Sequence, residues 1–172
     1  MAVAAYVTTQ ARLTLYEYLS KQGDSVLYYD RDSVIYIQNV DEPSKVETGY
    51  YLGDLTDEWE EFGSGSYIEE FVSGGPKYYA FSIFIPTTEK RTTRCKVKGI
   101  TLNYDNSRVV NFTSLRNMIL EDTSPLYVHD PRKIKRKHGG VVVSEPERKE
   151  YKVVFKKRRL LNDFDSFPYG YD

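Results

Sequence analysis

The 172-residue sequence contains only one cysteine, Cys95, and two histidines, His129 and His138. A single cysteine excludes an internal disulfide and a thiolate metal cluster, and it is typical of a chain in a reducing compartment. The two histidines do not have metal-ligand spacing, and no Ser/His/Asp or Cys/His arrangement is visible around them. A mechanism built on histidine or cysteine therefore has no support in the sequence.

The sequence also lacks a long apolar run and an internal repeat. No stretch approaches the roughly 20 apolar residues that a membrane helix requires. The first five residues are uncharged and are soon followed by polar ones, unlike a signal peptide. We therefore expect no membrane partner. The length suits one domain, or two small lobes, with a sizeable core.

Tyrosine and separated charge are what the sequence has in excess. Tyrosine accounts for 16 of the 172 residues. Residues 1–76 hold 4 Lys and Arg against 14 Asp and Glu, a net charge of −10, whereas residues 77–172 hold 20 against 11, a net charge of +9. This asymmetry indicates an acidic lobe and a basic lobe, and the basic lobe is a candidate for binding a polyanion. Attraction between the two halves is the alternative interpretation, and charge alone does not decide between them.

Hydrophobic periodicity predicts a mixed α+β fold. Apolar residues recur at helical spacing over residues 4–21, and Gly23 ends that helix. A second helix is predicted over residues 112–120, with Asn111 or Thr113 as its cap. Turn-forming residues separate short apolar runs, which predict strands at 78–85 and 93–101, a strand or short helix at 67–72, and a polar loop at 38–48.

The last third of the chain is basic. Residues 132–137 precede a Gly-Gly turn, and beyond it we predict a hairpin flanked by basic residues. Its strands are residues 141–143 and 151–155, joined by a polar turn at 144–147. The aromatic and acidic tail, residues 162–172, is predicted to be extended.

The most informative segment is residues 26–37. Two runs of β-branched and aromatic residues flank four polar residues, which predicts a β-hairpin with Asp30 and Asp32 at its tip. If both side chains point the same way, their oxygens form a hard site suited to Mg²⁺. The alternative is a solvated turn, because aspartate favours turns in any case.

Residues 28–33, Tyr-Tyr-Asp-Arg-Asp-Ser, resemble the Tyr-x-Asp-Thr-Asp-Ser motif in the palm domain of family B DNA polymerases. Residues 6–12 resemble the helix that leads into this motif in protein-primed members. Further segments match in order and approximate spacing, namely residues 52–53, 74–79, 96–101 and 139–143. The resemblance covers essentially the whole chain and points to the protein-primed branch of organelles, small phages, linear plasmids, adenoviruses and Polinton-type transposons.

The resemblance implies a partial polymerase palm, a helix plus an antiparallel β-hairpin sheet, followed by a small β-rich thumb. It places the palm in residues 1–90, a basic thumb-like subdomain in residues 91–161 and an extended tail in residues 162–172. In this family two Mg²⁺ ions about 4 Å apart hold the triphosphate and the primer 3′ oxygen for in-line attack. Asp32 would be a direct metal ligand, and Asp30 a supporting one.

Arg31 departs from the family pattern, which has threonine at this position. A guanidinium beside two carboxylates can pair with them and compete with a cation for the same oxygens. Alternatively, it points away and contacts a DNA phosphate. Arg31 therefore bears directly on whether this hairpin binds metal.

The resemblance also implies residues that grip DNA. Lys77 and Tyr79 would form the family's Lys-x-Tyr motif near the primer end, although the same residues suit the start of a strand with Tyr79 in the core. The basic runs are also compatible with solvated faces, and residues 156–159 with a nuclear import signal. The full implied set of DNA contacts is Tyr28, Lys77, Tyr79, Lys96, Lys98, Arg132, Lys133, Lys135, Arg136, Lys137, Lys156, Lys157, Arg158 and Arg159.

Two further family motifs do not occur before residue 28. One is Asp-x-x-Ser-Leu-Tyr-Pro, whose Asp completes the metal site, and the other is Lys-x-x-x-Asn-Ser-x-Tyr-Gly, whose Lys grips the triphosphate. Asn106-Ser107 echoes the second motif but has Leu102 where the Lys should be. Residues 163–169 echo the first motif, but they have Pro before Tyr and come after the thumb rather than at the start of the palm. We therefore expect the C-terminal palm and thumb part of a DNA-directed DNA polymerase that does not extend a primer alone. Its partners would be primer-template DNA, deoxynucleoside triphosphates in the whole enzyme, and a terminal protein primer. A non-catalytic nucleic-acid-binding module derived from such an enzyme, or a relic without a role, are the alternatives.

Overall fold

The computed structural model describes residues 2–99, 102–121, 124–153, 158–161, 166–168 and 170. By packing, the chain divides into two compact units, Met1–Glu58 (unit 1) and Trp59–Asp172 (unit 2). Both units contain antiparallel strands and helices, which confirms the mixed α+β class. The resemblance implies a palm that ends at residue 90. That position lies within unit 2, at the start of the strand Lys90–Val97, whereas the two units meet at residues 58 and 59.

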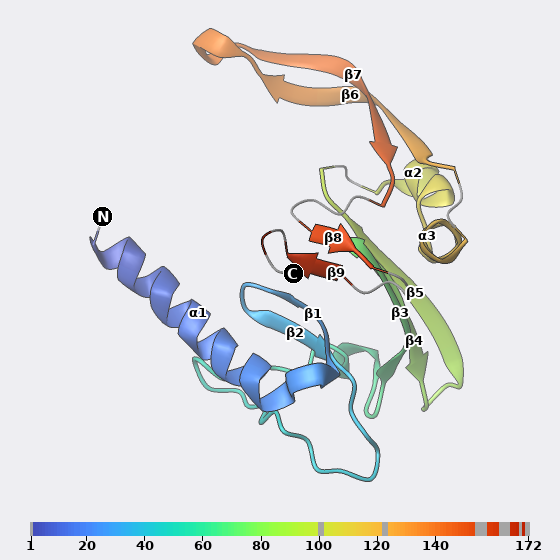
Figure 1. Ribbon diagram of the computed structural model, residues 1–172. Coiled ribbons are helices and arrows are strands. Elements are labelled where there is room, and N and C mark those ends of the chain that lie inside the picture. The colour runs from blue at the N-terminus through green and yellow to red at the C-terminus, as the bar shows by residue number, and fades with distance from the viewer. Residues whose placement is uncertain are drawn as a thin grey trace. The chain divides into compact units, whose positions relative to one another are not determined.

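Unit 1 begins with a long helix, α1 (Ala2–Gln22), as the periodicity predicted (Figure 1). Gly23, with a φ of 54°, ends it and opens the short 3₁₀ turn η1 (Gly23–Ser25). Only the last two turns are covered: Leu15, Tyr18 and Leu19 are half-buried and Gln22 is buried. The alanine-rich first part is exposed throughout, including the predicted apolar positions Ala4, Val7 and Ala11.

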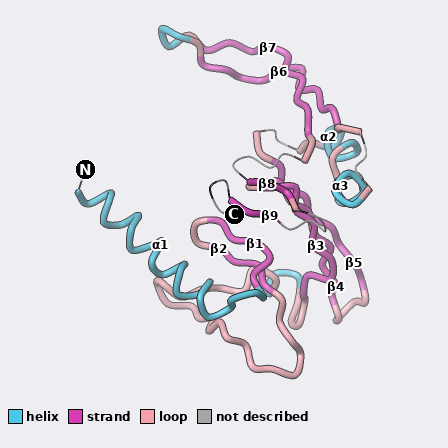
Figure 2. Tube along the Cα trace, in the orientation of Figure 1, coloured by secondary structure: helices cyan, strands magenta, loops and turns pink. Residues whose placement is uncertain are grey.

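The predicted hairpin follows directly. Strands β1 (Val26–Asp30) and β2 (Ser33–Tyr36) pair antiparallel, and Asp30 lies opposite Ser33. Beyond β2 the chain runs as an irregular loop to the end of unit 1, as Figure 2 shows. An isolated parallel bridge between Thr48 and Leu55 is its one described pairing. The polar loop predicted for residues 38–48 is therefore confirmed.

Unit 2 is organised on a three-stranded antiparallel sheet whose central strand is β4. This strand has the predicted bounds, and the segment that precedes it is a strand rather than a helix. Only glycine fits at residue 74, because a Cβ there would lie 2.6 Å from the ring of the buried Tyr78. The short turn η2 (Glu60–Phe62) comes first, and the strands are β3 (Tyr67–Gly75), β4 (Tyr78–Ile85) and β5 (Lys90–Val97).

The core of unit 2 lies between this sheet and helix α3 (Phe112–Leu120). Asn111 caps α3, since its side chain accepts the backbone N–H of Ser114 at 3.0 Å. Leu115 is fully buried, and burying a leucine stabilises the fold by about 1.5–3 kcal/mol. Sequence periodicity did not predict α2 (Tyr104–Val109), which is only six residues long and is capped by Asn103.

A two-stranded antiparallel ribbon extends from this core. It consists of β6 (Leu126–Arg136), the turn η3 (His138–Gly140) and β7 (Val142–Tyr151), and most of its length lies away from the sheet (Figure 1). The two ends of the ribbon nearest the core are anchored by Val128 and Tyr151, which are 1% and 5% exposed. The ring of Tyr151 stacks on that of Tyr78 at 5.6 Å.

The hairpin predicted from residues 141–143 and 151–155 is wrong. Residues 144–147 do not form a turn but lie inside β7, and the partner strand is β6. The misleading signal was Pro146, which is accommodated at a β-bulge. There it lies opposite two residues of β6, Pro131 and Arg132, so that both prolines fall where the hydrogen-bond ladder is interrupted. The reversal of the chain occurs instead at residues 137–141.

A last pair of short strands, β8 (Arg158–Leu160) and β9 (Ser166–Pro168), completes unit 2. Of the tail predicted to be extended, residues 166–168 form a strand and Gly170 lies in a turn, whereas residues 162–165, 169, 171 and 172 lie outside the described part. Among the described residues, no helix combines the length and the apolarity needed to cross a membrane.

Candidate functional site

The two candidate carboxylates occupy a sharp chain reversal. Asp30 is the last residue of β1 and is half-buried, whereas Asp32 lies in the two-residue loop and is exposed. The Asp32 N–H donates to the Asp30 carbonyl at 2.6 Å, which makes Arg31 the centre of a three-residue turn with a φ of 49°. The Ser33 hydroxyl also donates to the Asp30 carbonyl, at 3.1 Å. The backbone at the tip is therefore held firmly.

This geometry limits what the tip can do alone. Along a straight strand, Asp30 and Asp32 would share a face, but the chain reverses at Arg31, so the period-two rule does not apply across it. Within the described residues there is no group of three or more His, Cys, Asp or Glu side chains placed to hold a metal. Two carboxylates by themselves supply only part of a Mg²⁺ coordination shell, because this ion prefers near-octahedral oxygen ligands and retains waters. Tyr28, two residues before Asp30, is half-buried in β1.

Lys77 and Tyr79 lie at the start of β4 in unit 2. Lys77 is exposed in the turn after Pro76 and has a φ of 57°, a left-handed conformation that a β-carbon disfavours. Tyr79 is half-buried, and its ring lies 5.8 Å from Phe71 and 6.1 Å from Phe81. Tyr79 is thus neither a fully buried core residue nor a free surface one.

The pairing of β4 with β5 brings two of the predicted contacts together. Tyr79 is directly opposite Lys96, so these side chains stand next to each other on the same face of the sheet. The other face carries Tyr78, Ala80 and Cys95 into the core. Burial raises the pKa of the Cys95 thiol to about 11, so this residue is a poor nucleophile.

The base of the ribbon is tied to the segment after β5. The Lys98 carbonyl accepts hydrogen bonds from the Lys149 ammonium and, at 3.2 Å, from the Tyr151 hydroxyl. The Gly99 carbonyl accepts one from the Lys133 ammonium at 3.2 Å. Desolvation lowers the pKa of Lys149, and it raises the pKa of Tyr151 to about 12. The ammonium of Lys133, a predicted DNA contact, therefore positions the ribbon.

One face of the ribbon carries lysines that are neutralised by glutamates; we call it the lysine face. Lys135 forms an ion pair with Glu147 at 3.2 Å, and Lys137 forms a close ion pair with Glu145. These partners lower the pKa of Glu145, chiefly through its hydrogen bond with Lys137. The basic run at residues 132–137 is therefore less cationic on this face than the sequence suggests.

The opposite face carries arginines and exposed apolar side chains; we call it the arginine face. Arg132 and Arg136 project from β6, and neither guanidinium has an ion-pair partner in the described part of the chain. Arg148 projects from β7, with its guanidinium 4.2 Å from the centroid of the Tyr127 ring. Ile134, between the two β6 arginines, is 73% exposed. Alternation along paired strands separates these side chains from the lysines.

Four predicted contacts remain in the chain's last part. Lys156 and Lys157 lie outside the described residues. Arg158 begins β8, and Arg159 is exposed in the same strand. The structure thus separates the predicted DNA contacts into the β4–β5 face, the two ribbon faces and this terminal strand.

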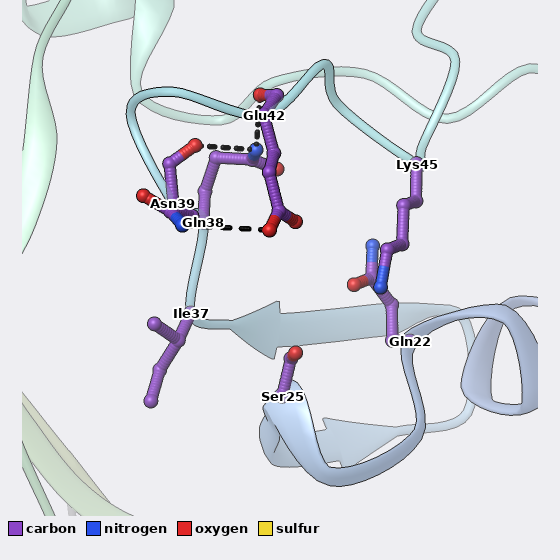
Figure 3. A pocket seen from close by; sticks show the side chains of 7 residues that line it. All are labelled: Gln22, Ser25, Ile37, Gln38, Asn39, Glu42 and Lys45. Carbon is purple, nitrogen blue, oxygen red and sulfur yellow. Dashed lines mark hydrogen bonds between the residues drawn. The ribbon is translucent and has the colours of Figure 1, made fainter.

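Sequence reasoning did not find a small polar hollow in unit 1, with a volume of about 200 Å³. It lies at the base of the β1–β2 hairpin, opposite the carboxylate tip, and the side chain of Gln22 forms its buried wall (Figure 3). Gln22 is 4% exposed, and its Nε2 is the one buried side-chain nitrogen or oxygen without a partner among the described residues. An unpaired buried polar group costs about 1–3 kcal/mol.

Comparisons with known proteins give no relative: no family model, no curated protein sequence and no solved structure matches this chain.

Proposed function

We propose that this chain is the palm and thumb part of a protein-primed family B DNA polymerase. In this proposal Asp30 and Asp32 contribute carboxylates to the Mg²⁺ site, and unit 2 grips primer-template DNA during nucleotidyl transfer. The observation that carries it is the two-residue hairpin loop. In this hairpin the Asp-x-Asp pair of the Tyr-x-Asp-x-Asp-Ser motif lies at the chain reversal, with Asp30 at the end of β1 and Asp32 exposed in the loop.

The charge arrangement of unit 2 supports a nucleic-acid partner. Arg132, Arg136 and Arg148 share one face of a two-stranded ribbon, and a ribbon of this kind fits the major groove of duplex DNA. Guanidinium groups bind phosphate oxygens bidentately, and such contacts are independent of base sequence, as a replicative enzyme requires. Tyr79 beside Lys96 adds an aromatic and a cationic group on a separate face.

Metal binding at the hairpin tip tests the catalytic part of the proposal. Mn²⁺ added in place of Mg²⁺ should broaden the amide resonances of residues 30–33 in an NMR spectrum. The Asp32→Asn variant should lose this effect, because it removes the exposed carboxylate of the Asp30 and Asp32 pair. Asp24→Asn is the matched control, since it removes one exposed carboxylate from the same unit at the other end of β1. Equal broadening in both variants would contradict a site at the tip.

A primer-extension assay separates a polymerase part from a complete enzyme. We expect the chain alone, with Mg²⁺, primer-template and triphosphates, to add no nucleotides. Extension that disappears in Asp32→Asn would instead show that the chain completes a two-metal site by itself.

A non-catalytic nucleic-acid-binding module derived from such a polymerase is the second candidate, and Arg31 favours it. Its guanidinium stands between the two aspartates in sequence and is exposed at the turn centre, where family members have threonine. This candidate predicts duplex binding that persists without Mg²⁺ and does not change in Asp32→Asn. It also predicts that Arg31→Thr does not strengthen Mn²⁺ broadening at residues 30–33, whereas the polymerase proposal predicts that it does.

A further inference from the structure

The hollow at the base of the β1–β2 hairpin has three hydrogen-bond donors that the chain leaves unused. Gln22 contributes its buried Nε2 from the end of α1, Ser25 its hydroxyl from η1, and Lys45 its ammonium from the loop that follows β2. Within the described residues, none of these three groups has a hydrogen-bond or ion-pair partner. In Figure 3, Lys45 extends from the loop toward the side of the hollow where Gln22 lies.

The remaining polar groups of the hollow are already engaged, and they fix the loop. The Gln38 amide donates to the carbonyls of Asn39 and Glu42, at 2.9 Å each. The Asn39 amide donates to the Glu42 carboxylate at 3.5 Å. At the hairpin base, the Ile37 N–H donates to the Ser25 carbonyl at 2.8 Å. The loop that carries Lys45 is therefore held close to η1 before any ligand arrives.

We propose that this hollow binds a phosphate group. An amide, a hydroxyl and an ammonium are typical phosphate contacts, and together they supply hydrogen-bond donors and one positive charge. An apolar ligand would leave Gln22 Nε2 unpaired, and a metal cation would face the Lys45 ammonium. The volume, about 200 Å³, is below the roughly 300–1,000 Å³ of sites for drug-sized ligands and suits a small anion with bound waters.

Glu42 allows a second test, because removing its charge should change phosphate affinity in the direction opposite to removing that of Lys45. Its carboxylate also lines the hollow, so it repels an anion bound by Gln22, Ser25 and Lys45. Neutralising Glu42 should therefore strengthen phosphate binding. A ligand with an ammonium or another donor group would show the reverse, because it would lose its acceptor. The site lies at the opposite end of β1 from Asp30 and Asp32, so the proposal does not depend on the polymerase function.

Titration with inorganic phosphate tests the site directly. At constant ionic strength, set with chloride, phosphate should shift the side-chain NH₂ resonances of Gln22 saturably in ¹⁵N-labelled protein. Lys45→Gln should weaken the fitted affinity at least about tenfold, because it removes a charge-assisted hydrogen bond. Glu42→Gln should tighten it several-fold. Lys21→Gln is the matched control: it removes one exposed cation of the same unit that does not line the hollow, and it should leave the affinity unchanged.

Gln22→Met keeps the size of the buried side chain and removes its amide. This variant should no longer bind phosphate saturably, as monitored by the backbone resonances of residues 25 and 45. Its circular dichroism spectrum should remain that of the parent protein. Shifts that do not saturate, or equal weakening in Lys45→Gln and Lys21→Gln, would overturn the proposal.

Two phosphate sources are distinguished by a second titration arm. A phosphodiester of a nucleic-acid strand should shift Gln22 when a single-stranded oligonucleotide is added, and inorganic phosphate should compete with it. A free phosphate or phosphomonoester should shift Gln22 without any effect of the oligonucleotide. If Mn²⁺ does not broaden residues 30–33, the polymerase proposal fails, but the expected results of the phosphate and oligonucleotide titrations stay the same.

Discussion

The two faces of the β6–β7 ribbon should differ sharply in their contribution to DNA binding. Arg132→Gln with Arg136→Gln removes two cations from the arginine face, which have no ion-pair partner in the described part of the chain. Lys135→Gln with Lys137→Gln removes the same charge from the same segment, but from side chains already paired with Glu147 and Glu145. If a basic run acted only through its net charge, both double variants would behave alike.

The salt dependence of binding gives the expected magnitude. Each phosphate contact with duplex DNA contributes about 0.9 to the slope of log K against log salt concentration. Loss of two arginine contacts should therefore reduce that slope by about 1.8, so that the fall in affinity between 50 and 200 mM salt becomes about tenfold smaller. The lysine variant should change the slope by less than ~0.5, because each of its two ammonium groups is already paired with a glutamate, whose charge offsets it toward phosphate.

Fluorescence anisotropy with a labelled duplex, at several salt concentrations, measures this slope. Thermal unfolding of both variants is the folding control, since exposed ion pairs contribute only about 0–1 kcal/mol to stability. A second control, Lys135→Gln with Glu147→Gln, deletes one ion pair without changing the net charge. Equal slopes for the arginine and lysine variants would refute the division of the ribbon into two faces, and unchanged slopes in both would remove the ribbon from the DNA contacts.

Further predictions concern the stability of unit 2. Leu115→Ala should lower the free energy of unfolding by about 2–5 kcal/mol, measured in urea, because it opens a cavity at a fully buried position. Lys77→Gly should raise it by up to ~1 kcal/mol, because glycine relieves the φ of 57°; a decrease would show that the lysine side chain stabilises the turn. Burial raises the pKa of Cys95 from 9.0 to about 11, so alkylation at pH 8 should be at least ~100-fold slower than in the unfolded chain. Since the unfolded thiol ionises first, stability should also fall as the pH rises from 9 to 11, and Cys95→Ser should weaken that fall.

Local patterns predicted those elements whose own residues decide their structure. Strand β4 has the predicted bounds, and α3 begins after Asn111, one of its two candidate caps. The hairpin carrying Asp30 and Asp32 also forms as predicted, because strongly strand-forming runs flank a short polar turn. At these positions propensity, capping and turn chemistry all favour the same structure.

The ribbon could not be predicted this way, because its pairing depends on which distant segments meet. Pro146 reads as a turn residue, yet it is accommodated in β7 by the bulge at residues 131 and 132 of the partner strand. Because β6 was not predicted as a strand, the sequence did not show that Arg132 and Arg136 lie on the opposite face from Lys135. Residues 132–137 therefore appeared as one basic cluster. A signal for the ribbon was nonetheless present in the sequence. Pairing residues 126–136 with residues 142–151 brings the lysines of the first segment near the glutamates of the second.

The hollow of unit 1 was hidden for a different reason. Gln22 ends a helix, and Lys45 lies in a loop without periodicity more than twenty residues later, so no local pattern links them. Only the return of the loop to the hairpin base brings the two together. Sequence reasoning thus located the carboxylate tip of unit 1 but not the donor cluster at the other end of the same hairpin.

The two prolines of the ribbon have a consequence for self-association. Each strand of an isolated two-stranded ribbon has an outer edge of backbone groups to which another strand can add, and such edges seed aggregation. Pro131 and Pro146 have no N–H to offer, and they lie together at a bulge in the middle of both edges. Charged side chains flank them on either side. The irregularity that disguised this ribbon in the sequence therefore also hinders a second copy of the chain from extending it into an intermolecular sheet.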